Sequence, residues 1–126
     1  MKTIIHTDKA PTPIGPYNQA VLVDNTLYTS GQIALNPATM ELVLGTIEIE
    51  TTQVMENMKA VLEAANMTFA DVVKSSIFIS DMNDFAKINI IYGSYFDEKT
   101  APARETVQVA KLPRNVNVEI SMIAIK

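Results

Sequence analysis

The sequence predicts an α+β fold, in which a single mixed β-sheet has two helices packed on one face. Two stretches, 51–65 and 85–95, place apolar residues at the spacing of a helix. Short runs that alternate apolar and polar residues, typical of half-buried strands, lie before, between and after these stretches. The expected order is therefore strand, hairpin, helix, strand, helix, strand, strand.

Length and composition favour one domain over residues 1–126, because the chain is short and 48% of its residues are hydrophobic. No apolar run approaches the ~18 residues of a membrane span. The net charge of −4, without a basic stripe, argues against a nucleic-acid binder. The chain has no cysteine, which excludes disulfides and fits a cytoplasmic location. The lone histidine, His6, rules out a multi-histidine metal site and is expected at the surface.

A stiff loop followed by a hairpin is expected in the first third of the chain. The stretch Ala10–Tyr17 contains three prolines and one glycine, so it should be irregular and hold Tyr17 at a fixed place. Gln19–Val23 and Thr26–Ser30 should pair through a two-residue turn, because Asp24 and Asn25 tolerate left-handed backbone angles. This register brings Tyr17 near the Ser30 end of the hairpin.

The remaining elements follow from capping signals and periodicity, whereas residues 33–49 show no regular pattern. They are a strand over Lys2–His6, a helix capped by Thr51 or Thr52 and ended by Asn66, a strand over Val72–Ser80, and a helix capped by Asp84. Two alternating runs, at 104–109 and 116–122, complete the sheet. Its second face is then uncovered and includes Ile123 and Ile125. Exposed apolar sheet surface marks association, so a homo-oligomer is expected.

The last two strands carry the strongest candidates for chemistry. If they pair as neighbours with their valines in one core, Arg104 and Glu119 point to the same side of the sheet. The two side chains can be a weak surface ion pair. Alternatively, Arg104 binds a small organic acid through paired hydrogen bonds and Glu119 acts as a base. Tyr17 and Ser30 can each add a donor, or be a core tyrosine and a turn serine. The pattern indicates a pocket for a small anion but does not indicate a reaction.

Several motifs together identify a family resemblance. The run Pro102-Ala103-Arg104, followed by Leu112-Pro113 and Val118-Glu119-Ile120, resembles the C-terminal signature of the RidA family, also called the YjgF/YER057c family. Other stretches agree in order and spacing: Ala10-Pro11, Ile14-Gly15-Pro16-Tyr17, Thr29-Ser30-Gly31-Gln32-Ile33, Asn36-Pro37, Asn57-Met58 and Asn83-Asp84-Phe85. The similarity covers essentially the whole chain.

The resemblance implies a chorismate-mutase-like fold and a homotrimer with its sites between subunits, without cofactor or metal. Members of the archetypal subgroup hydrolyse reactive 2-imino and 2-enamino acids, such as 2-iminobutanoate and 2-aminoacrylate, to 2-oxo acids and ammonia. Arg104 resembles the arginine that binds the substrate carboxylate, and Glu119 the glutamate that holds the attacking water. The resemblance also assigns substrate-binding positions to Tyr17, Ser30, Gly31 (through its N–H), Asn89 and Thr106.

Four positions depart from the family pattern. Thr106 stands where many members have cysteine, and we interpret it as a pocket wall and hydrogen-bonding group. Glu105 replaces a small residue, but alternation should send it to the face opposite Arg104. Met40 stands where glycine is usual, and Ser121 where a second acid is common. Two other functions remain open: a binding module for a small carboxylic acid, such as a 2-oxo acid, and a ribonuclease or translation inhibitor, which the acidic net charge disfavours.

Overall fold

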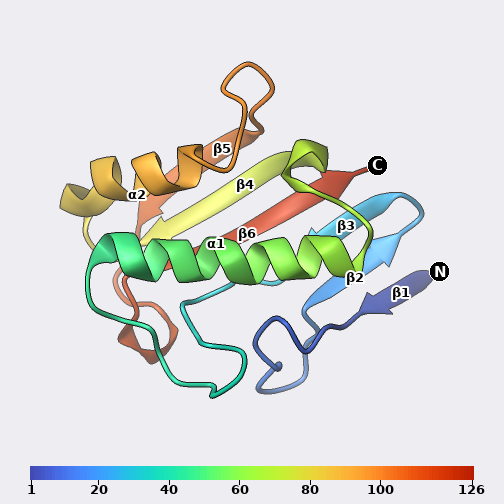
Figure 1. Cartoon of the computed structure of the whole chain (residues 1–126), viewed down its shortest axis with the longest axis horizontal. Coiled ribbons are helices and arrows are strands. Elements are labelled where there is room, and N and C mark those ends of the chain that lie inside the picture. Colours follow the sequence, from blue (N-terminus) through green and yellow to red (C-terminus); the bar gives the residue numbers. More distant parts are fainter.

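The computed structural model describes residues 1–126 and confirms the α+β architecture (Figure 1). Six strands form one sheet in the order β1-β2-β3-β6-β4-β5. The β4–β5 pair is parallel and every other pair is antiparallel, so the sheet is mixed. The strands are β1 (Lys2–Ile5), β2 (Ala20–Val23), β3 (Thr26–Thr29), β4 (Val72–Ile79), β5 (Ala103–Gln108) and β6 (Val118–Ile125). The helices are α1 (Ile47–Ala64) and α2 (Phe85–Gly93).

The predicted hairpin is confirmed in its register. Val23 lies opposite Thr26, and Asp24 takes the left-handed backbone angle that a two-residue turn requires, with φ of 54°. Beyond the last strand pair, the Ser30 N–H donates to the Gln19 carbonyl at 2.9 Å. The open end of the hairpin therefore lies where the sequence predicted it. The loop that carries Tyr17 precedes β2, and Ser30 follows β3.

Helix α1 begins earlier than the sequence indicated. Its cap is Thr46, whose side chain accepts a hydrogen bond from the Ile49 N–H at 3.1 Å. The predicted caps Thr51 and Thr52 lie inside the helix, where their hydroxyls donate to carbonyls one turn earlier. Two acidic residues in the first turn favour the earlier start, because the N-terminal end of a helix is electropositive. The predicted end is confirmed by left-handed Asn66, with φ of 59°.

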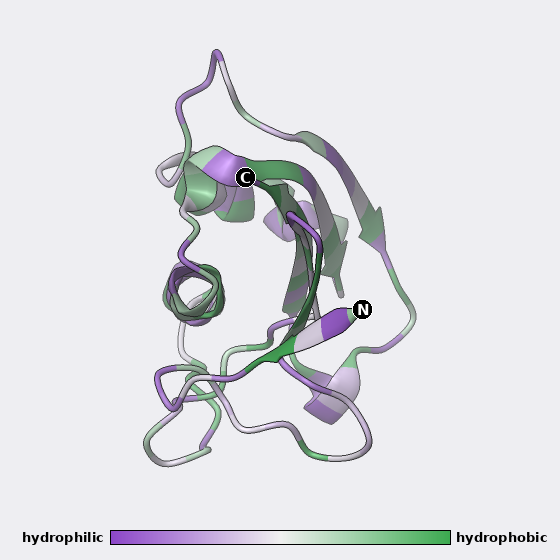
Figure 2. Cartoon of the chain, turned by 90° about the vertical axis from the view of Figure 1, so that its right-hand side faces the viewer, coloured by the Kyte–Doolittle hydropathy of each residue, from purple (hydrophilic) through white to green (hydrophobic).

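Both helices lie on one face of the sheet, as predicted, and Figure 2 shows α1 almost end-on beside it. The apolar stripe of α1 is fully buried: Val54, Met55, Met58, Val61 and Leu62. It packs on β-strand side chains such as Leu27, Ile77 and Ile120 in one core cluster of 20 residues. At about 1.5–3 kcal/mol for each buried aliphatic side chain, this stripe is a main source of stability.

The predicted pairing of the last two strands is wrong, because β4 lies between β5 and β6. Helix α2 connects β4 to β5, and these two strands lie parallel and adjacent, as strands joined by a helical crossover commonly do. Arg104 is in register with Ser75, which is buried beneath the helices, whereas Glu119 is in register with Phe78 on the other face. The two charged side chains therefore point to opposite faces. Val107, expected in the core, is 40% exposed.

The face away from the helices carries the apolar residues that the sequence left uncovered. By register this open face comprises Ile4, Val21, Tyr28, Phe78, Val107, Ile123 and Ile125, among others. Five of these seven side chains are strand valines or isoleucines, which normally pack against another surface. No helix of the structure has the length and hydrophobicity that crossing a membrane requires.

Candidate functional site

A pocket of about 540 Å³ gathers four of the predicted site residues at one end of the sheet. Its lining includes Tyr17 from the proline-rich loop, Ser30 and Gly31 from the segment after β3, and Glu119 from β6. The segment after β3 is fixed by paired backbone hydrogen bonds between Gln32 and Ile120, at 2.8 and 3.1 Å. Residues that are distant in the sequence therefore form one wall of this pocket.

Glu119 is the acidic group of the pocket. The side chain is half-buried, and this burial raises the pKa of the Glu119 carboxyl above its ordinary value. No lysine or arginine of the chain forms an ion pair with it. A carboxylate whose proton affinity is raised in this way is a better base than a fully solvated one. Glu119 can therefore accept a proton from a water molecule held beside it.

Gly31 lies directly against Glu119. A Cβ atom at position 31 would lie 2.8 Å from Cδ and 2.9 Å from Cγ of Glu119, closer than carbon atoms approach one another. A larger residue at position 31 would therefore displace the Glu119 side chain, although the backbone angle at Gly31 is ordinary. The glycine leaves the carboxylate where it lies and keeps the Gly31 backbone accessible from the pocket.

Tyr17 and Ser30 are held by the loops that carry them. The Tyr17 hydroxyl accepts a hydrogen bond from the Ile14 N–H at 3.2 Å, and the ring is 49% exposed. The Ser30 hydroxyl donates to the Asn18 carbonyl. Tyr17 is therefore a pocket residue rather than a core tyrosine, and its hydroxyl hydrogen remains available for donation.

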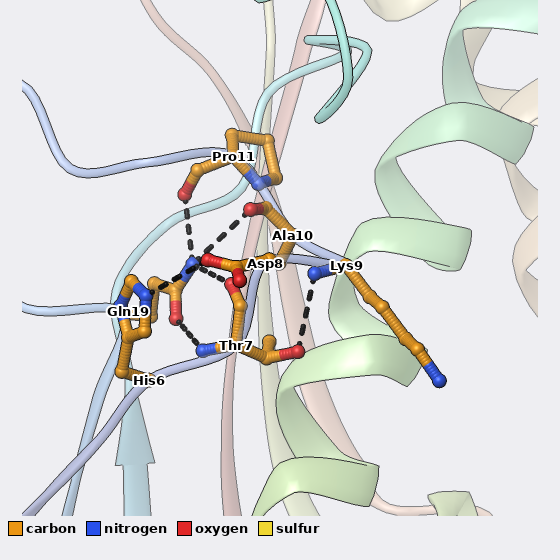
Figure 3. Close-up of polar contacts among 7 residues, drawn as sticks. All are labelled: His6, Thr7, Asp8, Lys9, Ala10, Pro11 and Gln19. Atoms are coloured by element: carbon orange, nitrogen blue, oxygen red, sulfur yellow. Dashed lines mark hydrogen bonds and ion pairs between the residues drawn. The ribbon is translucent and has the colours of Figure 1, made fainter.

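Gln19 anchors the proline-rich loop (Figure 3). The sequence patterns did not predict this role. The buried Gln19 side chain accepts from the Thr7 N–H at 2.7 Å and donates to the carbonyls of Thr7, Ala10 and Pro11 at 2.9–3.2 Å. These contacts fix the base of the loop that carries Tyr17. The sequence signal for this role was a glutamine at the start of a strand, next to a proline-rich stretch. Prolines lack the N–H groups that would form backbone hydrogen bonds within the loop.

Arg104 forms a second half-site on the helix face. Its guanidinium donates to the Asn89 side-chain oxygen at 2.6 Å, and Cζ lies 5.6 and 5.2 Å from the ring centroids of Phe85 and Tyr92. The Tyr92 hydroxyl donates to Ser75, and burial raises the Tyr92 pKa, so this neighbour stays neutral. No carboxylate pairs with Arg104. Its remaining donors are free for an anion.

Thr106 lies two residues after Arg104 and shares its face of β5. The Thr106 hydroxyl oxygen is buried and has no hydrogen-bond partner within the chain. Glu105 points to the opposite face, as predicted, where it contacts Lys74 at 2.6 Å and accepts from the Ser76 hydroxyl. The hydrogen bond from Lys74 has the larger effect in lowering the Glu105 pKa, and the hydrogen bond from Ser76 lowers it further. The charge of Glu105 is thereby kept away from Arg104.

The two half-sites do not meet within one chain. The Glu119 half-site comprises Tyr17, Ser30, Gly31 and Glu119, and the Arg104 half-site comprises Asn89, Arg104 and Thr106. From the register, the two charged residues are separated by two strand spacings and three residues along the strands, about 10 Å in each direction. Their side chains also lie on opposite faces of the sheet, so one small ligand cannot touch both within the same chain.

Glu50 and Arg114 also shape the Glu119 half-site. Glu50, almost fully buried on α1, accepts hydrogen bonds from the N–H groups of Asn117 and Val118 at 2.7 and 3.2 Å, which fixes the start of β6. Arg114 lines the pocket and takes a left-handed backbone. Met40 is also left-handed, with φ of 59°, so it adopts the conformation that glycine would adopt more readily. No group of three or more histidine, aspartate or glutamate side chains is arranged to hold a metal ion.

The fold and the two half-sites define an α+β protein whose polar sites suit a small molecule. Among known proteins, the family model described as "Endoribonuclease L-PSP" matches residues 7–126. The chain belongs to this family, which is the RidA family that the sequence motifs indicated.

Relatives of known sequence and of known structure match over nearly their whole length. A RutC family protein of Synechocystis is 52% identical over 123 residues, covering 97% of this chain and 95% of the relative. A 2-iminobutanoate/2-iminopropanoate deaminase of Dermatophagoides farinae is 52% identical over 124 residues, covering 98% and 96%. The crystal structure of the Rid family protein YyfA of Yersinia pestis superimposes with a TM-score of 0.97, at 45% identity and full coverage of both chains.

Proposed function

We propose that this protein is an enamine/imine deaminase that hydrolyses 2-aminoacrylate and 2-iminobutanoate to 2-oxo acids and ammonia. The observation that carries the proposal is Arg104, which is held by Asn89 at 2.6 Å and flanked by two aromatic rings, without a carboxylate partner. An arginine arranged in this way binds a carboxylate through two parallel hydrogen bonds. The relative named as such a deaminase, 52% identical, supports the same reaction.

The complete site, in this proposal, forms between two copies of the chain. One copy supplies Asn89, Arg104 and Thr106, and another supplies Tyr17, Ser30, Gly31 and Glu119. Two features support this arrangement: the half-sites lie on opposite faces of the sheet, and the open face carries exposed apolar strand residues. A homotrimer, which closes a ring of identical head-to-tail contacts, gives three such sites.

Binding begins with the substrate carboxylate on Arg104, assisted by the Gly31 N–H. The buried Thr106 hydroxyl, which lacks a partner in the single chain, is available as a further donor. An enamine substrate first becomes the imine by moving a proton from nitrogen to carbon. The imine carbon then faces Glu119 and its water, at a distance that the paired half-sites fix.

Hydrolysis needs one water molecule and no other reactant. Glu119 takes a proton from the water as the water oxygen bonds to the imine carbon, and passes this proton to the imine nitrogen. The resulting aminol carries a hydroxyl and an amino group on the same carbon. Collapse of this intermediate transfers the hydroxyl proton to Glu119, forms the carbonyl, breaks the carbon–nitrogen bond and releases ammonia. Because burial raises the Glu119 pKa, the protonated carboxyl can return its proton to the departing nitrogen.

The proposal is tested by adding purified protein to threonine dehydratase and threonine, and following conversion of the imine to 2-oxobutanoate. Wild-type protein should accelerate this step, and Arg104→Ala should lower kcat/KM by about 100-fold or more, as expected for loss of a paired, charge-assisted contact. Full activity in Arg104→Ala would overturn the assignment. Thermal stabilisation by 2-oxobutanoate without any turnover would instead support a carboxylate-binding module.

A further inference from the structure

Arg114 lies in the wall of the Glu119 pocket, apart from the groups that the proposed hydrolysis uses. Of the thirteen residues that line this pocket, only Arg114 and Glu119 carry charge. Arg114 is therefore the single cationic group that this chain contributes to the pocket. Its guanidinium forms no ion pair, with Glu119 or with any other residue. The positive charge is thus available to a ligand.

The backbone at Arg114 is unusual for a residue with a long side chain. It has φ of 56° and ψ of 22°, a left-handed conformation that glycine and asparagine adopt more readily. The adjacent Asn115 is left-handed as well, with φ of 58°. Such strain persists where the surroundings impose it, and it concentrates at functional sites. Glycine would fit this position with less strain, so the presence of arginine is best explained by what its side chain does.

The turn that presents Arg114 is firmly held. It begins at Pro113 and is closed by a hydrogen bond from the Asn115 N–H to the Leu112 carbonyl at 3.0 Å. Leu112 and Val116, on either side of the turn, are buried, with 6% and 1% of their surface exposed. The backbone position of Arg114 is therefore fixed relative to Glu119, three residues beyond Val116, and its side chain is exposed at the pocket that it lines.

The pocket is larger than a four-carbon substrate requires. Its volume of about 540 Å³ falls in the range that drug-sized ligands occupy, about 300–1,000 Å³. In the proposed reaction the α-carboxylate is bound by Arg104 of another copy and the imine carbon faces Glu119. The substrate side chain is then the part that extends into the remaining volume, where Arg114 is the available cation.

We propose that Arg114 is a specificity-determining residue that binds a second carboxylate, at the far end of the substrate, so that the site accepts imines of acidic amino acids. This inference rests on the proposed deaminase function. A distal carboxylate would be repelled by ionised Glu119, and Arg114 offsets this repulsion while holding the substrate by charge-assisted hydrogen bonds. The matching substrate class is the 2-imino dicarboxylic acids, of which 2-iminoglutarate is the test compound.

The experiment compares two imines with the same carbon chain. An amino-acid oxidase generates 2-iminoglutarate from glutamate and 2-iminopentanoate from norvaline, and hydrolysis is measured in competition with semicarbazide. Arg114→Gln should raise KM for 2-iminoglutarate about tenfold or more, the effect of losing a hydrogen bond to a charged group, and leave 2-iminopentanoate within twofold. Arg114→Lys, which keeps the charge, should recover most of the lost affinity.

A binding measurement on the wild-type protein keeps the test independent of variant folding. 2-Oxoglutarate should raise Tm more than 2-oxopentanoate at equal concentration. Equal effects of Arg114→Gln on both imines, or hydrolysis of 2-iminopentanoate with none of 2-iminoglutarate, would overturn this inference and leave the deaminase function standing. Failure of the wild type on both imines would overturn the proposed function itself.

Discussion

Replacing Gly31 by alanine tests whether the exact place of Glu119 matters for hydrolysis. The new Cβ would lie 2.8 Å from Cδ and 2.9 Å from Cγ of Glu119. Carbon atoms prefer separations of about 3.5–4.0 Å, so the carboxylate must move by about 0.7–1 Å. A displacement of this size can cost about 100-fold in rate when the moved group orients the attacking water. We therefore expect Gly31→Ala to lower kcat for 2-iminobutanoate by about 10- to 100-fold.

The fold should tolerate this change. Gly31 does not have a positive φ, and the atoms that must move belong to the end of a flexible, half-buried side chain. Tm should consequently stay within a few degrees of the wild type. Gly93→Ala is the matched control, because a Cβ there meets nothing within 4 Å; it should leave kcat unchanged and keep Tm at or slightly above the wild-type value, since alanine favours the helix. A Gly31→Ala enzyme with wild-type kcat would refute the role given to Glu119.

Three other substitutions test the roles of Glu119, of the open face and of Gln19. Glu119→Gln should lower kcat by about 10²–10⁴-fold, and the wild-type rate should fall as pH drops through the raised Glu119 pKa, which a pH–rate profile measures. Because that pKa is raised by folding, the ionised form destabilises the native state; Glu119→Gln should therefore melt at or above the wild-type Tm at neutral pH, and this difference should vanish in acid. Val107→Asp places a charge on the open face and should yield monomers by sedimentation, with deaminase activity lost. Gln19→Ala removes four hydrogen bonds from the proline-rich loop and should lower the free energy of unfolding by about 2–4 kcal/mol in denaturant titration, whereas an unchanged value would show that the prolines alone hold the loop.

The fold class was predictable because alternation and helical periodicity reflect burial directly. The stripe of α1 and the Asp24 turn needed no tertiary information, since each follows from local spacing and backbone preference. The start of α1 was misplaced, because the buried face of its first turns carries the polar residues Glu50 and Thr51, which interrupt the apolar periodicity. Local patterns therefore identified the elements better than their ends.

The order of the strands in the sheet could not be predicted from local alternation. Alternation alone allowed Arg104 and Glu119 to share a face, and it failed because the valines of β5 and β6 face opposite ways: Val107 lies on the open face and Val118 in the core. The helix between β4 and β5 was a signal that these two strands pair, since parallel neighbours need such a crossover. Val107 shows the same error: a valine on the open face has the same alternation as a valine in the core, and the pattern cannot distinguish them.

The candidate site was predicted in part. Tyr17, Ser30, Gly31 and Glu119 gather in one pocket, and Asn89 contacts Arg104, as the family motifs implied. Gln19 and Arg114 were missed, because their roles depend on contacts and backbone angles that short motifs do not reveal. The separation of the two half-sites was equally hidden, since it arises only when the strands are placed in the sheet.

Mixing inactive variants tests most directly whether each site joins Arg104 of one copy to Glu119 of another. Arg104→Ala and Glu119→Gln proteins are unfolded together in equal amounts, refolded, and assayed for hydrolysis of 2-iminobutanoate. Random assembly of a ring with sites between subunits restores about a quarter of the wild-type activity, because one site in four pairs an intact Arg104 with an intact Glu119. If the mixture is no more active than the separate variants, although it assembles normally, the shared site is contradicted.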